Sequence, residues 1–105
     1  MKQNRYRIRV EQFENTKGQP VSRDALSFEV GNHDDMFHIV ELMRAKGYFD
    51  QDTATAFAIG LKLFSEVMLE NQDHPLFEDF KPHFTQFMKQ LKGKNRGEVS
   101  ERNKV

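Results

Sequence analysis

The stretch NRYRIRVEQ, residues 4–12, decides the fold. Its apolar residues alternate with arginines and a glutamate, which is the period of two of a strand with one face in water. A turn-forming cluster, NTKGQP at residues 15–20, separates it from a second alternating stretch over residues 24–30. Since the connection is too short for a parallel crossover, the two strands are predicted to pair as an antiparallel hairpin. One face of that hairpin would carry Tyr6, Ile8, Val10, Leu26, Phe28 and Val30.

Three helical patterns follow. The first covers residues 33–46, and Asn32 is its predicted N-cap because an amide oxygen can accept from the free backbone N–H groups of a first turn. Apolar residues recur there at helical spacing until a basic last turn and a glycine end the pattern. The second pattern begins at a capping Asp50 or Asp52 and reaches about Glu70.

The second and third patterns predict most of the helical packing. In the second, the stripe that includes Phe64 should enter the core, and Gly60 should allow another backbone to approach closely because it lacks a Cβ. The third begins at Asp73 and spaces phenylalanines by three and four residues. Pro82 interrupts it, which predicts either a kink or a short helix that ends near Lys81.

The predicted class is α+β, in the order β-β-α-α-α, with one domain over residues 1–91. Residues 92–105 carry too few apolar side chains to offset the cost of ordering, so they are expected to form a disordered basic tail. A two-stranded hairpin is marginal by itself. It should therefore pack against the three helices, or its sheet should be extended in a dimer. Ten phenylalanines in 105 residues are more apolar surface than two short strands can cover. Most of them should be buried between the helices of one chain, and a minority, with Phe80 and Phe87 as the candidates, should reach a homodimer interface.

Composition excludes several classes of protein. A chain of 105 residues has room for one ordinary domain. Sixteen basic residues balance sixteen acidic ones, so no net charge attracts the chain to nucleic acid or to an anionic membrane. There is no cysteine, no apolar run of signal-peptide type and no membrane-spanning stretch, and the mean hydropathy is −0.77. We therefore expect a cytoplasmic protein without a membrane partner.

The densest polar cluster is the candidate functional surface: Asn32, His33, Asp34, Asp35 and His38. On the predicted helix Asp34 and His38 are four residues apart, so both would project from one face and could hold half of a metal site. Asp35 and His38 are an alternative pair. The further ligands would have to come from His74, His83 or a distant carboxylate, none of which lies at a recognisable motif spacing. The structural alternative is that Asn32 caps the helix while the two aspartates complement its dipole. No cofactor is implied.

The order of these segments also resembles a known family. The opening YRIRVE at residues 6–11 and GNHDDMF at residues 31–37 resemble a small bacterial family of unknown function, known for its His-Asp-Asp motif, over roughly residues 4–91. The resemblance implies no activity, and it directs attention to His33, Asp34 and Asp35. The metal-dependent phosphohydrolases that are also named for a His-Asp pair need further ligands, which are not placed here.

Three functional hypotheses remain. The leading one is a non-catalytic interaction module that forms a homodimer or binds another protein, because the hairpin edges are unsupported and phenylalanine is abundant. The absence of a phosphate loop and of a hydrolase motif disfavours an enzyme. The second is a ligand or metal site, with hydrolysis as one use, at residues 32–38. The third is weak nucleic-acid binding by Arg5, Arg7 and Arg9, which would lie in a row on one strand face. Cross-strand pairing with Glu29 is the commoner use of such a row.

Overall fold

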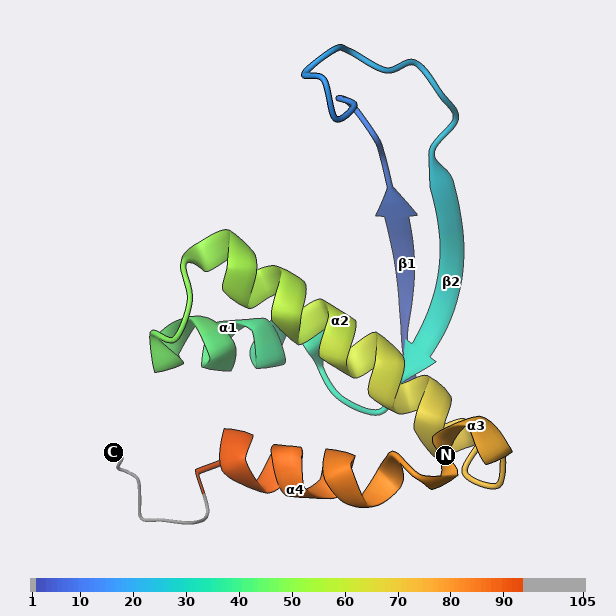
Figure 1. Ribbon diagram of the computed structural model, residues 1–105, viewed down its shortest axis with the longest axis vertical. Coiled ribbons are helices and arrows are strands. Elements are labelled where there is room, and N and C mark those ends of the chain that lie inside the picture. Colours follow the sequence, from blue (N-terminus) through green and yellow to red (C-terminus); the bar gives the residue numbers. More distant parts are fainter. Residues whose placement is uncertain (1, 94–105) are drawn as a thin grey trace. The chain divides into compact units, whose positions relative to one another are not determined.

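The computed structural model describes residues 2–93. It confirms the α+β class, with a hairpin followed by helices, but it contains four helices where the sequence predicted three (Figure 1). The described chain divides into two compact units, residues 2–66 and 67–93. The elements are β1 (Asn4–Val10), β2 (Leu26–Asn32), α1 (Met36–Lys46), α2 (Gln51–Glu70), α3 (Pro75–Glu78) and α4 (Lys81–Leu91). The predicted tail lies outside the described residues from residue 94 onward.

The hairpin has the predicted antiparallel pairing. Tyr6 lies opposite Val30 and Ile8 lies opposite Phe28, so the apolar side chains of both strands share one face. On the other face Arg7 lies opposite Glu29 and donates from Nη2 to its Oε2 over 2.7 Å. This hydrogen bond and the arginine charge hold the pKa of the Glu29 carboxyl below its ordinary value. The predicted use of the arginine row in cross-strand pairing is confirmed at this position.

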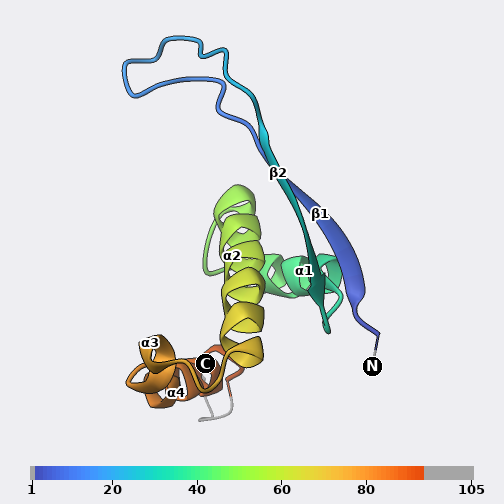
Figure 2. The same ribbon diagram turned by 90° about the vertical axis from the view of Figure 1, so that its right-hand side faces the viewer.

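The loop between the strands is organised by Asn15. Its Oδ1 accepts from the backbone N–H groups of Lys17 and Gln19, both over 2.9 Å, and Gly18 has the positive φ of 77° that such a tight turn needs. Beyond Val10 the loop over residues 11–25 continues past α1 and α2, as Figures 1 and 2 show. The far half of the hairpin is therefore not covered by these helices.

Helix α1 begins three residues later than predicted. Its N-cap is Asp35, whose Oδ1 accepts from the N–H groups of Phe37 and His38 over 3.0 and 3.3 Å. The assignment of Asn32 as the cap is therefore wrong, because Asn32 is the last residue of β2. The helix ends where predicted, at Gly47, whose φ of 72° is the left-handed conformation of a helix stop.

Helix α2 begins after Asp50, one of the two predicted caps. Asp50 Oδ1 accepts from the N–H of Thr53 over 2.8 Å, and this hydrogen bonding lowers the pKa of the Asp50 carboxyl. Its fully buried residues in the first unit include Ala54 and Ala58, one turn apart. Phe64 is 41% exposed, so its predicted place in the core is wrong. The small residues, and not this phenylalanine, provide the closely packed face.

The proline in the last helical pattern divides it. Of the two alternatives, a short helix followed by a break is the one observed: α3 ends at Glu78 and α4 begins at Lys81, with Pro82 in its first turn. A proline in a first turn costs little, because its missing N–H would have no partner inside the helix. None of the helices within residues 2–93 has the length and apolar character required to cross a membrane.

Gly60 provides a direct test of the packing of α2. A Cβ at this position would meet no atom within 4 Å, so the predicted close backbone approach is wrong. Gly60→Ala should therefore raise the free energy of unfolding by about 0.5–1 kcal/mol, because alanine lowers the entropy cost of forming the helix. Urea denaturation measures this change. Gly47→Ala is the control and should destabilise the protein, since its φ of 72° strains any residue with a Cβ. Loss of stability in Gly60→Ala would contradict the open position.

Met36 and Phe64 test where the core lies. Met36 is 2% exposed and Phe64 is 41% exposed. Met36→Ala should cost about 2–5 kcal/mol through the cavity it leaves. Phe64→Ala should cost clearly less, because much of its ring is already in water. Thermal melts of both variants measure these losses of stability. A larger loss for Phe64→Ala than for Met36→Ala would show that the phenylalanine stripe forms the core.

Candidate functional site

The candidate surface begins at Asn32, which has the most buried polar side chain in the described chain. It is 2% exposed. Its Oδ1 accepts from the backbone N–H of Asp34 over 2.9 Å, and its Nδ2 donates to the carbonyl of Lys62 in α2 over 3.0 Å. Asn32 therefore fixes the chain reversal after β2 against α2, which is a structural role different from the predicted helix cap.

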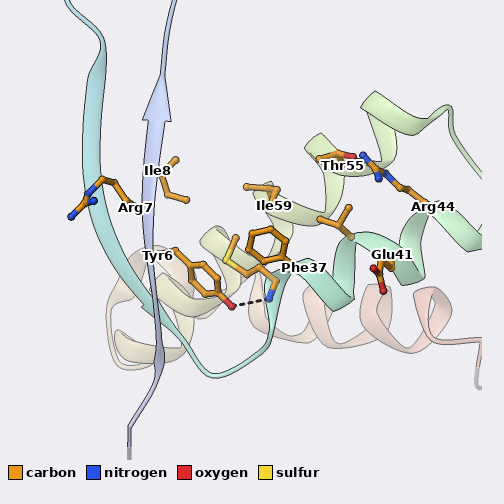
Figure 3. A pocket seen from close by; sticks show the side chains of 10 residues that line it. Tyr6, Arg7, Ile8, Phe37, Glu41, Arg44, Thr55 and Ile59 are labelled. Atoms are coloured by element: carbon orange, nitrogen blue, oxygen red, sulfur yellow. Dashed lines mark hydrogen bonds between the residues drawn. The ribbon is translucent and has the colours of Figure 1, made fainter.

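Asp34 connects three elements. Its carbonyl accepts from Asn4 Nδ2 and from the Tyr6 hydroxyl, both over 3.1 Å, and its carboxylate forms an ion pair with Lys62. The Tyr6 oxygen in turn accepts from the backbone N–H of Met36 over 3.0 Å (Figure 3). These contacts attach β1 to the first turn of α1 and to α2. We refer to Asn4, Tyr6, Asn32, Asp34 and Lys62 as the junction.

His33 lies beside a carboxylate that sequence reasoning missed. Its Nδ1 is 3.2 Å from Oε2 of Glu66, and Gln3 Nε2 donates to the same oxygen over 2.8 Å. Glu66 is 8% exposed, while the His33 side chain is 43% exposed. The sequence contained one indirect signal: Lys62 and Glu66 continue the row of Ala54 and Ala58 at steps of four. That row therefore changes from small residues to charged ones on one helix face.

The first pair of the metal hypothesis, Asp34 and His38, is predicted to share a helical face. Asp34 precedes the N-cap Asp35, so it is not part of α1, and the predicted four-residue spacing on one helix is wrong. Among residues 2–93 no group of three or more His, Cys, Asp or Glu side chains is placed to hold a metal ion. A ligand or metal function of residues 32–38 stays a prediction.

A concavity lies between β1, α1 and α2 within the first unit. Its volume is about 400 Å³, within the range of small binding pockets. Figure 3 shows Ile8, Phe37 and Ile59 around this space, with Arg44 and Thr55 at one end. There Arg44 Nε donates to Thr55 Oγ1 over 3.1 Å, which joins α1 to α2. The apolar lining is Tyr6, Ile8, Met36, Phe37, Val40 and Ile59, and the polar lining is Arg7, Glu41, Arg44 and Thr55.

The arginine face has a smaller hollow of about 200 Å³, lined by Arg5, Tyr6, Arg7 and Glu29. Glu29 forms ion pairs with two of these arginines, at 2.7 Å from Arg7 and 3.8 Å from Arg5. Arg9 pairs with Glu11 over 3.1 Å. Each arginine of the row therefore faces a carboxylate, which weakens the attraction of this face for phosphate.

Comparison with known proteins places the chain in a family. Residues 4–93 match the family described as a domain of unknown function with a solved structure, DUF3861, and the chain belongs to it. The crystal structure at 2.20 Å of a protein of unknown function from Pectobacterium atrosepticum is similar, with a TM-score of 0.73 and 39% sequence identity. The match covers 86% of this chain and 97% of that one. No curated protein matches the chain at a significant level.

Family membership confirms the general resemblance in the sequence, namely that to a family without assigned activity. The status of His33, Asp34 and Asp35 as the hallmark of that family stays a prediction. Within this chain, the backbone and side chain of Asp34 and the carboxylate of Asp35 all make local or junction contacts. Asp34 and Asp35 therefore have structural roles at the start of α1.

Asn32→Ala tests the junction. We expect a loss of about 2 kcal/mol in unfolding free energy, because the substitution removes two hydrogen bonds and leaves the Asp34 N–H without its acceptor in a part-buried place. Asp35→Ala is the matched comparison and should cost about 1 kcal/mol, the usual value of a helix N-cap. Chemical denaturation of both variants measures the difference. Equal costs, or a larger cost for Asp35→Ala, would contradict the junction role of Asn32.

Proposed function

We propose that the protein is a non-catalytic interaction module that forms a homodimer through its hairpin. The observation that supports this most is the exposure of apolar side chains on the far half of the hairpin. Val10 is 53% exposed, Leu26 is 63% exposed and Phe13 in the adjoining loop is 78% exposed. Phe28 also remains substantially exposed. We call Val10, Phe13, Leu26 and Phe28 the arm patch.

The arm patch is a costly feature for an isolated chain. Each large side chain that leaves water gains about 1.5–3 kcal/mol, and apolar residues gathered on one surface are typical of sites that bind another protein. Three of the four residues lie on the same face of one hairpin, since Val10 is opposite Leu26 and Phe28 follows two residues later. A second copy of the chain offers the same uncharged surface and so can cover the patch without burying a charge.

The charges on the hairpin favour contact through its face over pairing through its edges. A two-fold axis through the middle of β1 would place Arg7 opposite Arg7 of the second copy, with Arg5 opposite Arg9. The same axis through the middle of β2 would place Glu29 opposite Glu29. Like charges directly opposite one another destabilise a strand pair. The arm patch contains no charged side chain and has no such penalty.

Two further attributes belong to this proposal. We place the protein in the cytoplasm, a location supported by the absence of cysteine from the 105-residue sequence. Nucleic-acid binding is not part of the proposed function, because the arginine row is matched by Glu29 and Glu11.

Sedimentation equilibrium tests the homodimer. We expect a dimer at high micromolar concentration and a monomer for Leu26→Glu, because the dimer would bury the new carboxylate without a partner. Leu76→Glu is the matched control: Leu76 is 73% exposed on α3, outside the arm patch, and its substitution should leave the dimer intact. A monomeric wild-type chain would refute the proposal, and so would dissociation by the control but not by Leu26→Glu.

A further inference from the structure

Gln3, His33 and Glu66 form a polar cluster that has no part in the proposed homodimer. Nε2 of Gln3 donates to Oε2 of Glu66 over 2.8 Å, and Nδ1 of His33 lies 3.2 Å from that oxygen. The Glu66 side chain is 10% exposed. A carboxylate that is nearly removed from water is costly unless it accepts hydrogen bonds. Gln3 and His33 therefore supply what the burial of Glu66 requires.

Gly31 provides the space across which Gln3 reaches Glu66. A Cβ built on Gly31 would lie 2.1 Å from Oε1 of Gln3 and 3.0 Å from its Cδ, and both distances are shorter than van der Waals contact. The backbone does not require a glycine here, because Gly31 is not among the glycines with positive φ. The side chain of Gln3 thus occupies the place that a side chain at position 31 would take.

The same contacts determine where the proton of the His33 ring lies. An ionised carboxylate has no hydrogen to donate, so a hydrogen bond between Glu66 and Nδ1 requires a proton on Nδ1. The amide nitrogen of Gln3, 3.4 Å from Nδ1, is also a donor and cannot accept this proton. In the neutral imidazole the lone pair then lies on Nε2. Every hydrogen bond and ion pair that His33 makes with the described part of the chain is at Nδ1, so Nε2 can accept from an outside donor.

We propose that Gln3 is a latch: across Gly31 it holds the Glu66 carboxylate against His33, which fixes the imidazole with Nδ1 protonated and Nε2 as a free acceptor. When Gln3 is displaced, Glu66 can turn towards water, and the His33 ring loses its fixed tautomer and orientation. The latch thus controls the chemical state of His33 on the candidate surface. It does not depend on the homodimer, because these residues all lie in the first unit and outside the arm patch.

A double-mutant cycle tests the latch. Gln3→Ala should lower the folding equilibrium constant about five- to tenfold, because it removes the amide that donates to a buried carboxylate. Gly31→Ala should give a loss of similar size, because its methyl group displaces the same amide. The double variant should be about as stable as Gln3→Ala alone, since the methyl group at position 31 then has no amide to displace. Urea denaturation measures the stability of each protein.

Asp50→Ala is the matched control for this cycle. Asp50 caps the end of α2 that lies farthest from Glu66, so its cost should add to that of Gln3→Ala. Additive costs for Gly31→Ala and Gln3→Ala would overturn the latch. A Gly31→Ala variant as stable as the wild-type chain would overturn it as well.

Nitrogen NMR of the histidine rings tests the state of His33, which a purely structural contact would not set. When the ring is neutral, His33 of the wild-type chain should be protonated at Nδ1 and unprotonated at Nε2. Gln3→Ala should reduce the fraction of this tautomer, while the ring of His38 on α1 should not change. Circular dichroism melts establish that the variant is folded. A wild-type His33 protonated at Nε2 would overturn the fixed imidazole, and an unchanged tautomer in Gln3→Ala would overturn its control by the latch.

Discussion

The hydroxyl group of Tyr6 holds the hairpin against the helices. It donates to the carbonyl of Asp34 and accepts from the N–H of Met36, so one side chain of β1 satisfies two backbone groups at the point where the chain turns into α1. Asn32 fixes the same turn to α2 through the carbonyl of Lys62. A two-stranded hairpin has little stability of its own. These contacts anchor its base, and the position of the concavity and the exposure of the arm patch both follow from this anchoring at one end.

The sequence predicted most of the secondary structure because the relevant patterns are local. Alternation in residues 4–10 indicated the strand, its exposed face and cross-strand pairing of the arginine row with Glu29, although not that Arg7 is the main partner. Gly47 indicated the end of α1. Pro82 indicated a break in the last helical pattern, although local rules could not decide between a kink and a short helix that ends near Lys81, and they did not predict the second helix α4. The register of β1 against β2 follows from the period of two, since a slip of one residue would move the apolar side chains of one strand to the opposite face of the hairpin.

The errors have a common physical origin in contacts between distant segments. Asn32 and Asp35 are both competent N-caps. The choice between them depends on the Lys62 carbonyl, which lies 30 residues away in α2 and engages Asn32. Glu66 is buried on α2 and lies beside His33, which is 33 residues earlier in the chain. No sequence motif indicates that these two residues are close together. Phe64 followed the apolar stripe, but Ala54 and Ala58 provide the buried face of α2 in the first unit.

The expected sheltering of the hairpin by helices is therefore only partly realised. Tyr6, Ile8 and Val30 near the base are partly buried, whereas Val10 and Leu26 beyond them are more than half exposed. The base of the hairpin is thus packed within the chain, whereas the far half is largely exposed. The concavity and the candidate cluster are neighbours, because residues 32–38 form the turn and the first residues of α1, which include the lining residues Met36 and Phe37.

Hydroxyl-radical footprinting across the dissociation range would test this account most directly, because it reports the exposure of individual side chains. As the protein concentration rises, the oxidation rates of Leu26, Phe13 and Val10 should fall together, while those of Leu42 and Leu76 stay constant. Oxidation rates for the first three residues that do not change with concentration would contradict the account.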